Sequence, residues 1–147
     1  METPAPLLTK ARGSYAIALH LPFPTTITVG ALGIRNFAAG YYLYVGSAWG
    51  PGGLAARVGR HLRGPTTTHW HIDYLRARSR PIAIWLAPQR HEECAWIAYL
   101  ATLPEISWPV PGFGASDCPC ATHLAYLDSQ KQQLPRLPHA EGPYLLA

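Results

Sequence analysis

Three short segments of the sequence carry phenol, guanidinium and imidazole side chains, which are groups that bind anions and transfer protons. Gly13-Ser14-Tyr15 begins one apolar segment, and Tyr44-Val45-Gly46 ends another. The third segment, Arg57-Val-Gly-Arg60-His61, places its polar residues three and four positions apart, so a helix would present them on one face. An arginine fork offers paired hydrogen-bond donors and a histidine carries protons near neutral pH, so this face carries groups for anion binding and proton transfer.

The surrounding pattern predicts the elements that must position these residues. β-Branched, aromatic and aliphatic runs between glycines and prolines predict strands at residues 15–21, 25–29, 41–45, 81–87 and 122–127. Leu54, Val58 and Leu62 recur every four residues, which predicts a helix that ends at Gly64-Pro65. Because this apolar stripe lies beside the Arg57 face, the helix can pack on a sheet while its polar side chains face a groove.

Two further helices are predicted downstream. The hydroxyls of residues 66–68 can cap a short helix through residues 70–75. Glu92 and Glu93 lie where a first helical turn favours acids, and the helix continues through residues 94–103 to Pro104. This helix is apolar almost all round, which predicts a central, well-buried element. Residues 108–117 have the composition of a loop.

These elements predict an α/β domain of the α+β type, a small and mainly antiparallel sheet flanked by helices. The expected organisation is an N-terminal extension at residues 1–12, one domain at 13–127 and a flexible C-terminal tail at 128–147. A length of 147 residues suits one domain, and 48% hydrophobic with 14% charged residues excludes a mainly disordered chain. The longest apolar run, residues 82–87, is too short to cross a bilayer.

The charge distribution is uneven although the net charge is only +4. No acidic residue occurs from position 3 to 72, whereas six acids face three bases after position 80. Such separation predicts a basic face that attracts polyanions, and it equally fits a surface that only maintains solubility. Three cysteines, an odd number, and the absence of a secretory signal predict a cytoplasmic protein.

The ordered set of segments resembles the GIY-YIG nuclease superfamily, in particular its small single-domain Uri-type branch, over roughly residues 12–127. Gly13-Ser-Tyr15 stands for the first signature and Tyr44-Val-Gly46 for the second, while residues 70–74 and 112–120 resemble features of the Uri-type branch. The middle position of the first signature, Ser14, is expected to tolerate change. The segment between the signatures is longer than usual in the family, so residues 21–40 are expected to add a strand or loop.

The resemblance implies a GIY-YIG-like fold and a metal-dependent endonuclease that hydrolyses phosphodiester bonds in DNA, which could be branched, damaged or single-stranded. It implies that Tyr44 is the general base, that Tyr15 is its partner and that Arg57 clamps the phosphate. His61 is a candidate second proton carrier or phosphate donor. Further candidates for nucleic-acid binding are Arg60, Arg63, His71 and Arg76.

The family places a metal-binding glutamate on a later helix, which implies Mg²⁺ or Mn²⁺ as cofactor. Here the candidates are Glu92 and Glu93. Glu93 is favoured because it precedes Trp96, Ile97 and Leu100 at helical spacing and so begins an inward stripe. Glu92 remains open as an alternative that would otherwise only cap the helix.

Two other functions fit parts of the sequence. A nucleic-acid-binding module without catalysis would need only the basic face. A zinc-stabilised protein would use a tetrahedral set of three thiols and an imidazole, if the chain brings them together. These four zinc candidates are Cys94, Cys118, Cys120 and His123. With no separate recognition domain, a nuclease of this size would cut by substrate shape, with weak selectivity, or through a partner protein.

Overall fold

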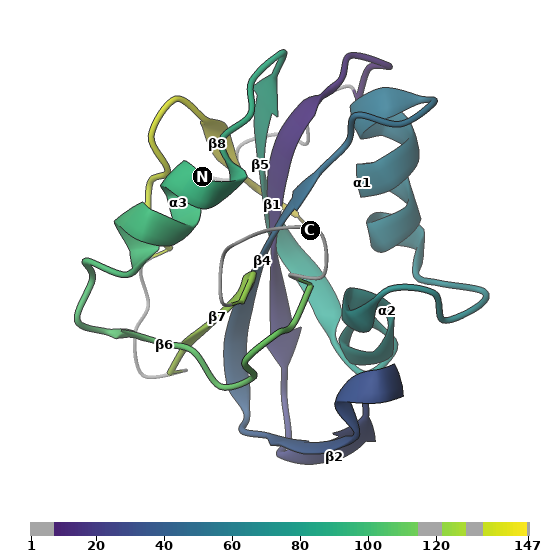
Figure 1. Cartoon of the computed structure of the whole chain (residues 1–147), viewed down its shortest axis with the longest axis vertical. Helices are drawn as coiled ribbons and strands as arrows, with labels where there is room; N and C mark the ends of the chain where they lie inside the picture. Colours follow the sequence, from purple (N-terminus) through teal and green to yellow (C-terminus); the bar gives the residue numbers. More distant parts are fainter. Residues whose placement is uncertain (1–7, 115–121, 129–133, 147) are drawn as a thin grey trace.

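A six-stranded antiparallel sheet lies at the centre of the computed structural model, which describes residues 8–114, 122–128 and 134–146. Its strand order is β6-β7-β4-β1-β5-β8 (Figure 1). The strands are β1 (Gly13–Leu21), β4 (Gly40–Ser47), β5 (Arg80–Pro88), β6 (Ile106–Ser107), β7 (Leu124–Leu127) and β8 (Glu141–Leu145). The helices are α1 (Gly53–Arg63), α2 (His71–Arg76) and α3 (Glu93–Leu100). The predicted α+β class is therefore confirmed.

The long segment between the two tyrosine motifs forms a small second sheet. Strand β2 (Thr25–Thr28) pairs with β3 (Ile34–Phe37), and the 3₁₀ turn η1 (Gly30–Leu32) joins them. This agrees with the expectation that residues 21–40 add a strand or loop. Phe37 and Ile27 attach this sheet to the main core, so the insertion extends the fold without entering the main sheet.

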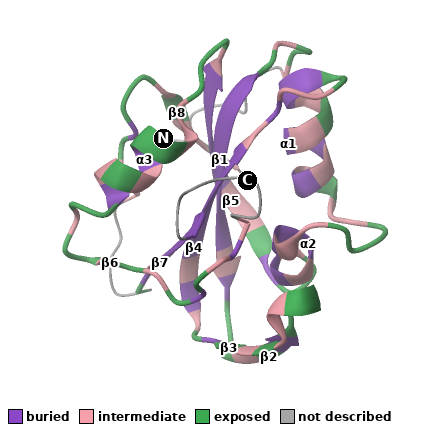
Figure 2. Cartoon of the chain, viewed as in Figure 1, coloured by how far each residue is buried: buried purple, intermediate pink, exposed green. Residues whose placement is uncertain are grey.

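Alternate residues of the central strand β1 face two different cores. Tyr15, Ile17 and Leu19 belong to the core that α1 and α2 cover, whereas Ala16 and Ala18 belong to the core under α3. The period of two expected for a strand explains this division. The small residues on the α3 side leave room for the buried indoles of Trp85 and Trp96. Figure 2 shows that the central strands are buried while the outer helix faces are exposed.

Helix α1 is fixed at both ends by groups outside it. At its start, the carbonyl oxygens of Ala11 and Thr9 accept hydrogen bonds from the backbone N–H groups of Leu54 and Ala55, at 2.8 and 2.7 Å. At its end, Arg76 donates from Nε to the carbonyl of His61 at 2.6 Å, and from Nη2 to that of Leu62 at 3.0 Å. These contacts satisfy backbone groups that the helix leaves unpaired.

Helix α3 is less buried than its composition predicts. Only Trp96 and Leu100 are buried, while Cys94, Ala95 and Ala98 are exposed. The prediction of a central, well-buried helix is therefore wrong. The physical reason is that alanine favours a helix without needing burial, so one pair of large residues, four positions apart, is enough to anchor α3 on the sheet.

The C-terminal segment also differs from the prediction of a flexible tail. Residues 141–145 form β8, which pairs with β5, and Leu137 lies in the core under α3. Two indole N–H groups fix the segment that precedes β8. Trp85 donates to the carbonyl of Pro135 at 3.1 Å, and Trp96 donates to that of Pro138 at 2.7 Å. These contacts are made across the fold and leave no local period in the sequence.

No helix in the described ranges combines the length and apolar character that crossing a bilayer requires.

We predict that Leu137→Ala lowers the free energy of unfolding by about 2–5 kcal/mol, because it removes a buried side chain that the surrounding core cannot fully replace. Urea unfolding at equilibrium measures this loss. Leu145→Ala is the matched control, since Leu145 is 39% exposed in β8 and its truncation should change stability little. Equal and small effects of the two substitutions would contradict the packing of this segment.

Candidate functional site

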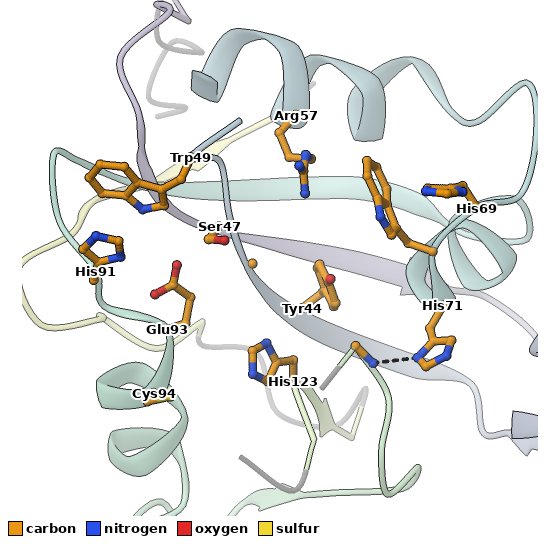
Figure 3. A pocket seen from close by; sticks show the side chains of 13 residues that line it. Tyr44, Ser47, Trp49, Arg57, His69, His71, His91, Glu93, Cys94 and His123 are labelled. Carbon is orange, nitrogen blue, oxygen red and sulfur yellow. Dashed lines mark hydrogen bonds between the residues drawn. The ribbon is translucent and has the colours of Figure 1, made fainter. Parts of the chain in front are cut away.

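A pocket of about 500 Å³ opens between the end of β4, helix α1 and the start of α3. Figure 3 shows Tyr44 on β4, Arg57 extending from α1 toward the pocket, and Glu93 at the opposite side at the start of α3. The lining residues described are Tyr44, Gly46, Ser47, Trp49, Arg57, His69, Trp70, His71, His91, Glu93, Cys94, Gly114 and His123. The structure therefore brings together three candidates that lie far apart in the sequence.

Tyr15 and His61 lie behind this pocket and form a buried pair. Each is 1% exposed, and the Tyr15 hydroxyl is 2.7 Å from Nε2 of His61. Both rings lie close to Tyr44, with centroids 6.4 and 6.0 Å from it. Neither residue is among the described lining residues, so they support Tyr44 from the interior.

Burial sets the protonation of this pair. Loss of solvation raises the pKa of Tyr15 well above its ordinary value, and the neighbouring Tyr44 raises it further. The same loss of solvation lowers the pKa of His61 to about 4. Both residues are therefore neutral at neutral pH, and one hydrogen bond joins the Tyr15 hydroxyl to Nε2 of His61. Nδ1 of His61 is buried and has no hydrogen-bond partner in the described part of the chain.

A close backbone approach gives Tyr15 its position. Gly46 pairs with Tyr15 across β1 and β4. A Cβ at Gly46 would lie 2.6 Å from the Tyr15 hydroxyl oxygen, which is closer than packed atoms tolerate. The glycine of the Tyr44-Val45-Gly46 motif is thus required by the tyrosine of the other motif.

Tyr44 is held between the sheet and a loop. Gly114 has a φ of +68°, and a Cβ there would lie 2.8 Å from the Tyr44 ring. His71 fixes this loop, because its Nδ1 accepts a hydrogen bond from the Gly114 N–H at 2.8 Å (Figure 3). Burial raises the pKa of Tyr44 to about 12, and the positive charge of Arg57 opposes that rise. The phenol is therefore protonated at neutral pH.

Arg57 is supported by an aromatic ring at the rim of the pocket. Its guanidinium carbon lies 4.3 Å from the centre of the Trp70 ring, and that of Arg60 lies 4.4 Å from it. Such contacts hold a cation through the electron-rich face of the ring. Because Trp70 limits the motion of the Arg57 side chain, the guanidinium is positioned before any ligand binds.

Glu93 and Glu92 occupy different places although they are adjacent. Glu93 lines the pocket, whereas Glu92 precedes α3 and is not among the described lining residues. Each carboxylate has one buried oxygen, Oε1, without a hydrogen-bond partner in the described ranges. The pocket position distinguishes Glu93 as the carboxylate that can meet a ligand bound near Arg57.

Ser14 positions the segment that leads to Glu93, a role the sequence did not indicate. Its hydroxyl donates to the carbonyl of Arg90 at 2.8 Å and accepts from the N–H of Glu92 at 2.7 Å. Ser14 is fully buried. The residue expected to tolerate change therefore ties β1 to the start of α3.

Arg60 and Arg76 serve the fold in this structure. Arg60 makes a two-pronged contact with the buried carboxylate of Asp73, whose second oxygen also accepts from the N–H groups of His69 and Trp70 at 2.8 Å. Arg76 caps α1 as described above. Arg63 is exposed at the end of α1 and is not among the described lining residues, so it remains available to a ligand at the surface.

The zinc candidates are only partly visible. Cys94 and His123 both line the pocket, while Cys118 and Cys120 lie outside the described residues. His123 donates from Nδ1 to the carbonyl of Val45 at 3.0 Å, and its buried Nε2 has no partner within the described ranges. No group of three or more metal-ligating side chains occurs among the residues that the structure describes. The zinc set therefore stays a prediction.

Several lining residues were not identified from the sequence. Trp49 and His91 stack face to face, with centroids 4.0 Å apart and planes 8° from parallel. Ser47 also lines the pocket. These residues come from loops and strand ends that carry no periodic pattern, so only the tertiary structure brings them to the site.

The chain belongs to the family described as Domain of unknown function DUF123, which matches residues 14–142. The matched range contains all the described residues that line the pocket, and it extends past residue 127 into β8. No curated protein and no solved structure matches the chain.

We predict that Gly46→Ala destabilises the protein by about 1–3 kcal/mol, because the added methyl group displaces the Tyr15 hydroxyl in a packed core. Thermal unfolding measures this change. Gly50→Ala is the matched control, because its nearest neighbour would be Nη2 of Arg57 at an ordinary 3.8 Å. If Gly46→Ala unfolds at the wild-type temperature, the close approach of Tyr15 to Gly46 is absent in solution.

We predict that stability falls as the pH is lowered from 6.5 toward 4. A histidine whose pKa is lowered by folding takes up protons more readily when unfolded, so acid favours the unfolded state. For His61, with a pKa of about 4, the loss at pH 4.5 relative to pH 7 is about 2–3 kcal/mol. Burial also lowers the pKa of His71, which acts in the same direction.

The measurement is the unfolding free energy across this pH range. In His61→Gln, which keeps an acceptor for Tyr15 but cannot titrate, the dependence should be clearly shallower. His20→Gln, at the other end of β1, is the control and should keep the wild-type slope. A His61→Gln protein with the full wild-type slope would show that another group causes the acid sensitivity.

Proposed function

We propose that this protein is a metal-dependent endonuclease that hydrolyses phosphodiester bonds in DNA, with the pocket as its active site. The observation that supports the proposal is the meeting of a guanidinium, a phenol and a buried carboxylate oxygen, from Arg57, Tyr44 and Glu93, at one pocket. The resemblance of the sequence to GIY-YIG nucleases implies phosphate binding by Arg57, proton transfer by Tyr44 and metal binding by a glutamate for which Glu93 and Glu92 are the candidates. A phenol, a guanidinium and a carboxylate at one pocket can supply the proton transfer, phosphate binding and metal binding of phosphodiester hydrolysis.

Arg57 is proposed to bind a non-bridging oxygen of the scissile phosphate. Its planar fork offers paired donors, and these fit a phosphate better than the point charge of a lysine does. The Trp70 ring holds the guanidinium at the rim of the pocket, so little side-chain freedom is lost when phosphate binds. The absence of acidic residues from position 3 to 72 favours the approach of a polyanion.

Glu93 fits the role of a ligand to Mg²⁺ or Mn²⁺. These cations prefer carboxylate oxygens and keep several waters, so one protein carboxylate can be sufficient. Oε1 of Glu93 is buried with no hydrogen-bond partner in the described part of the chain, and such an oxygen gains most from a cation. A divalent cation held there would stabilise the negative charge that develops on the phosphate.

Tyr44 is proposed to orient the attacking water and to accept its proton. A pKa of about 12 makes the phenol too reluctant an acid to exist as phenolate at neutral pH without nearby positive charge. Arg57 already lowers this pKa, and a phosphate-bound cation would lower it further. Tyr15 and His61 are proposed to fix the Tyr44 ring from behind, without touching the substrate.

A non-catalytic nucleic-acid-binding module is the second candidate. The observation that favours it is the raised pKa of Tyr44, the tyrosine that lines the pocket, because a protonated tyrosine is a good hydrogen-bond donor to phosphate and a poor base. The two functions share Arg57 and differ in whether Glu93 is needed, which makes the carboxylate the discriminating residue.

We predict Mg²⁺-dependent nicking when the purified chain is incubated with branched, single-stranded and duplex DNA. Arg57→Ala and Glu93→Gln should each lower the nicking rate by roughly 100-fold or more, the effect typical of a lost charge-stabilising group. Glu92→Gln and Arg78→Ala are matched controls, because neither residue is among the described pocket-lining residues. Both controls should cut at the wild-type rate.

Other outcomes would reject the proposal in different ways. Cutting that survives both Arg57→Ala and Glu93→Gln would place the nuclease activity elsewhere or in a contaminant. Binding of all three substrates without cutting, weakened by Arg57→Ala but not by Glu93→Gln, would establish the binding module instead. A Glu92→Gln protein that loses activity while Glu93→Gln retains it would exchange the roles of the two carboxylates.

A further inference from the structure

The Trp49–His91 stack at the rim of the pocket has a geometry that suits a nucleobase. The two rings are nearly parallel, at 8°, with centroids 4.0 Å apart. Other ring pairs around the pocket are tilted or edge-on, including His69–Trp70 at 64° and Tyr44–Phe113 at 75°. This parallel pair is therefore a stacked aromatic surface to which a third flat ring can be added.

The stack is not part of either hydrophobic core. Trp49 lies in the loop between β4 and α1, and His91 lies in the loop between β5 and α3. Neither residue belongs to the two clusters of buried apolar side chains. His91 is an exposed residue and lines the pocket, so a ligand in the pocket can reach it. Nε1 of Trp49 is buried and lacks a hydrogen-bond partner among the described residues.

The stack shares its pocket with the proposed phosphate-binding residue. Trp49, His91 and Arg57 all line the same cavity of about 500 Å³, a volume typical of sites that enclose a small ligand. Figure 3 shows the Trp49–His91 pair on the opposite side of the pocket from His69 and His71, with Arg57 between them. A nucleotide whose phosphate meets Arg57 would thus carry its base toward one of these walls.

We propose that His91, backed by Trp49, stacks an unpaired nucleobase next to the phosphate bound by Arg57, so that the substrate is single-stranded DNA or a single-stranded region. This inference rests on the proposed function and specifies its substrate class. Bases inside a duplex already stack on both faces and offer no free surface to an imidazole. An unpaired base offers one, and stacking on aromatic side chains accepts every base.

The test measures DNA binding in EDTA, where metal-dependent cutting is absent. Fluorescence anisotropy compares a short labelled oligothymidylate with a blunt duplex of the same length. The wild-type protein should bind the single strand more tightly. His91→Ala should weaken single-strand binding by roughly 5- to 100-fold, the effect of one lost base–aromatic stack, and should leave duplex binding unchanged.

Two further variants distinguish the effect of stacking from that of charge and from a nonspecific effect of replacing a histidine. His91→Phe keeps a flat ring without an imidazole and should retain the wild-type affinity for the single strand. His20→Ala is the matched control, because His20 also lies beside an aromatic ring, Tyr41, with centroids 4.9 Å apart, but at the other end of β1. It should bind both substrates as the wild type does.

Three results would overturn the proposed stacking of a base on His91. These are equal affinity of the wild type for the two substrates, unchanged single-strand binding by His91→Ala, and an equal loss of single-strand affinity in His91→Phe and His91→Ala. The nicking assay distinguishes this failure from failure of the proposed function. Mg²⁺-dependent cutting without a preference for the single strand would reject only the base stacking on His91. A preference for the single strand without any cutting would reject only the endonuclease.

Discussion

Hydrogen bonds made by the side chains of two consecutive residues of β1 hold the two halves of the pocket in place. Because side chains alternate along a strand, Ser14 and Tyr15 point to opposite faces of the sheet. The Tyr15 hydroxyl bonds to His61 on α1, the helix that carries Arg57. The Ser14 hydroxyl bonds to the backbone on both sides of His91, next to Glu93. One strand therefore sets the separation of a guanidinium on one face and a carboxylate on the other.

The burial that makes this framework rigid also determines its charges. Removing Tyr15, His61 and Tyr44 from water disfavours the charged form of each, so the interior behind the pocket is neutral. The unbalanced charge then lies at the rim and mouth, on Arg57 and Glu93. The neutral side chains behind Arg57 and Glu93 make their surroundings less polar than water. Electrostatic interactions of these two residues with a ligand are therefore stronger than they would be in water.

Local patterns were sufficient for the central part of the fold. Alternation and the four-residue recurrence of Leu54 and Val58 located β1, β4 and α1, since these elements are buried on the faces that the patterns mark. The same reasoning placed Tyr44 and Arg57, which the structure brings to one pocket. It failed for β8, because Trp85 and Trp96 fix the C-terminal segment through hydrogen bonds to carbonyls that are distant in the sequence. It also failed for the burial of α3, because alanine favours a helix without needing burial.

The candidate site shows the same limit at the level of side chains. Arg57, Arg60 and Arg76 look alike in the sequence, and spacing alone cannot say which of them faces a ligand. The structure separates them by their partners: a buried carboxylate engages Arg60, and the carbonyls at the end of α1 engage Arg76. Ser14, Trp49 and His91 carried no signal, because their contacts join loops and strands that lie far apart in the chain.

The partners of Arg60 and Arg76 within the fold bear on the proposed recognition of nucleic acid. The charge of Arg60 is balanced by Asp73. Arg76 donates to carbonyls at the C-terminal end of α1, where the negative end of the helix dipole offsets its charge. Neither can displace many counterions from a DNA backbone, so the basic field is weaker than the count of arginines indicates. A protein with few phosphate contacts gains little affinity from duplex charge alone. Under the proposed function, selectivity then depends on short-range contacts at the pocket, where the shape and stacking of the bound strand would decide which DNA is held.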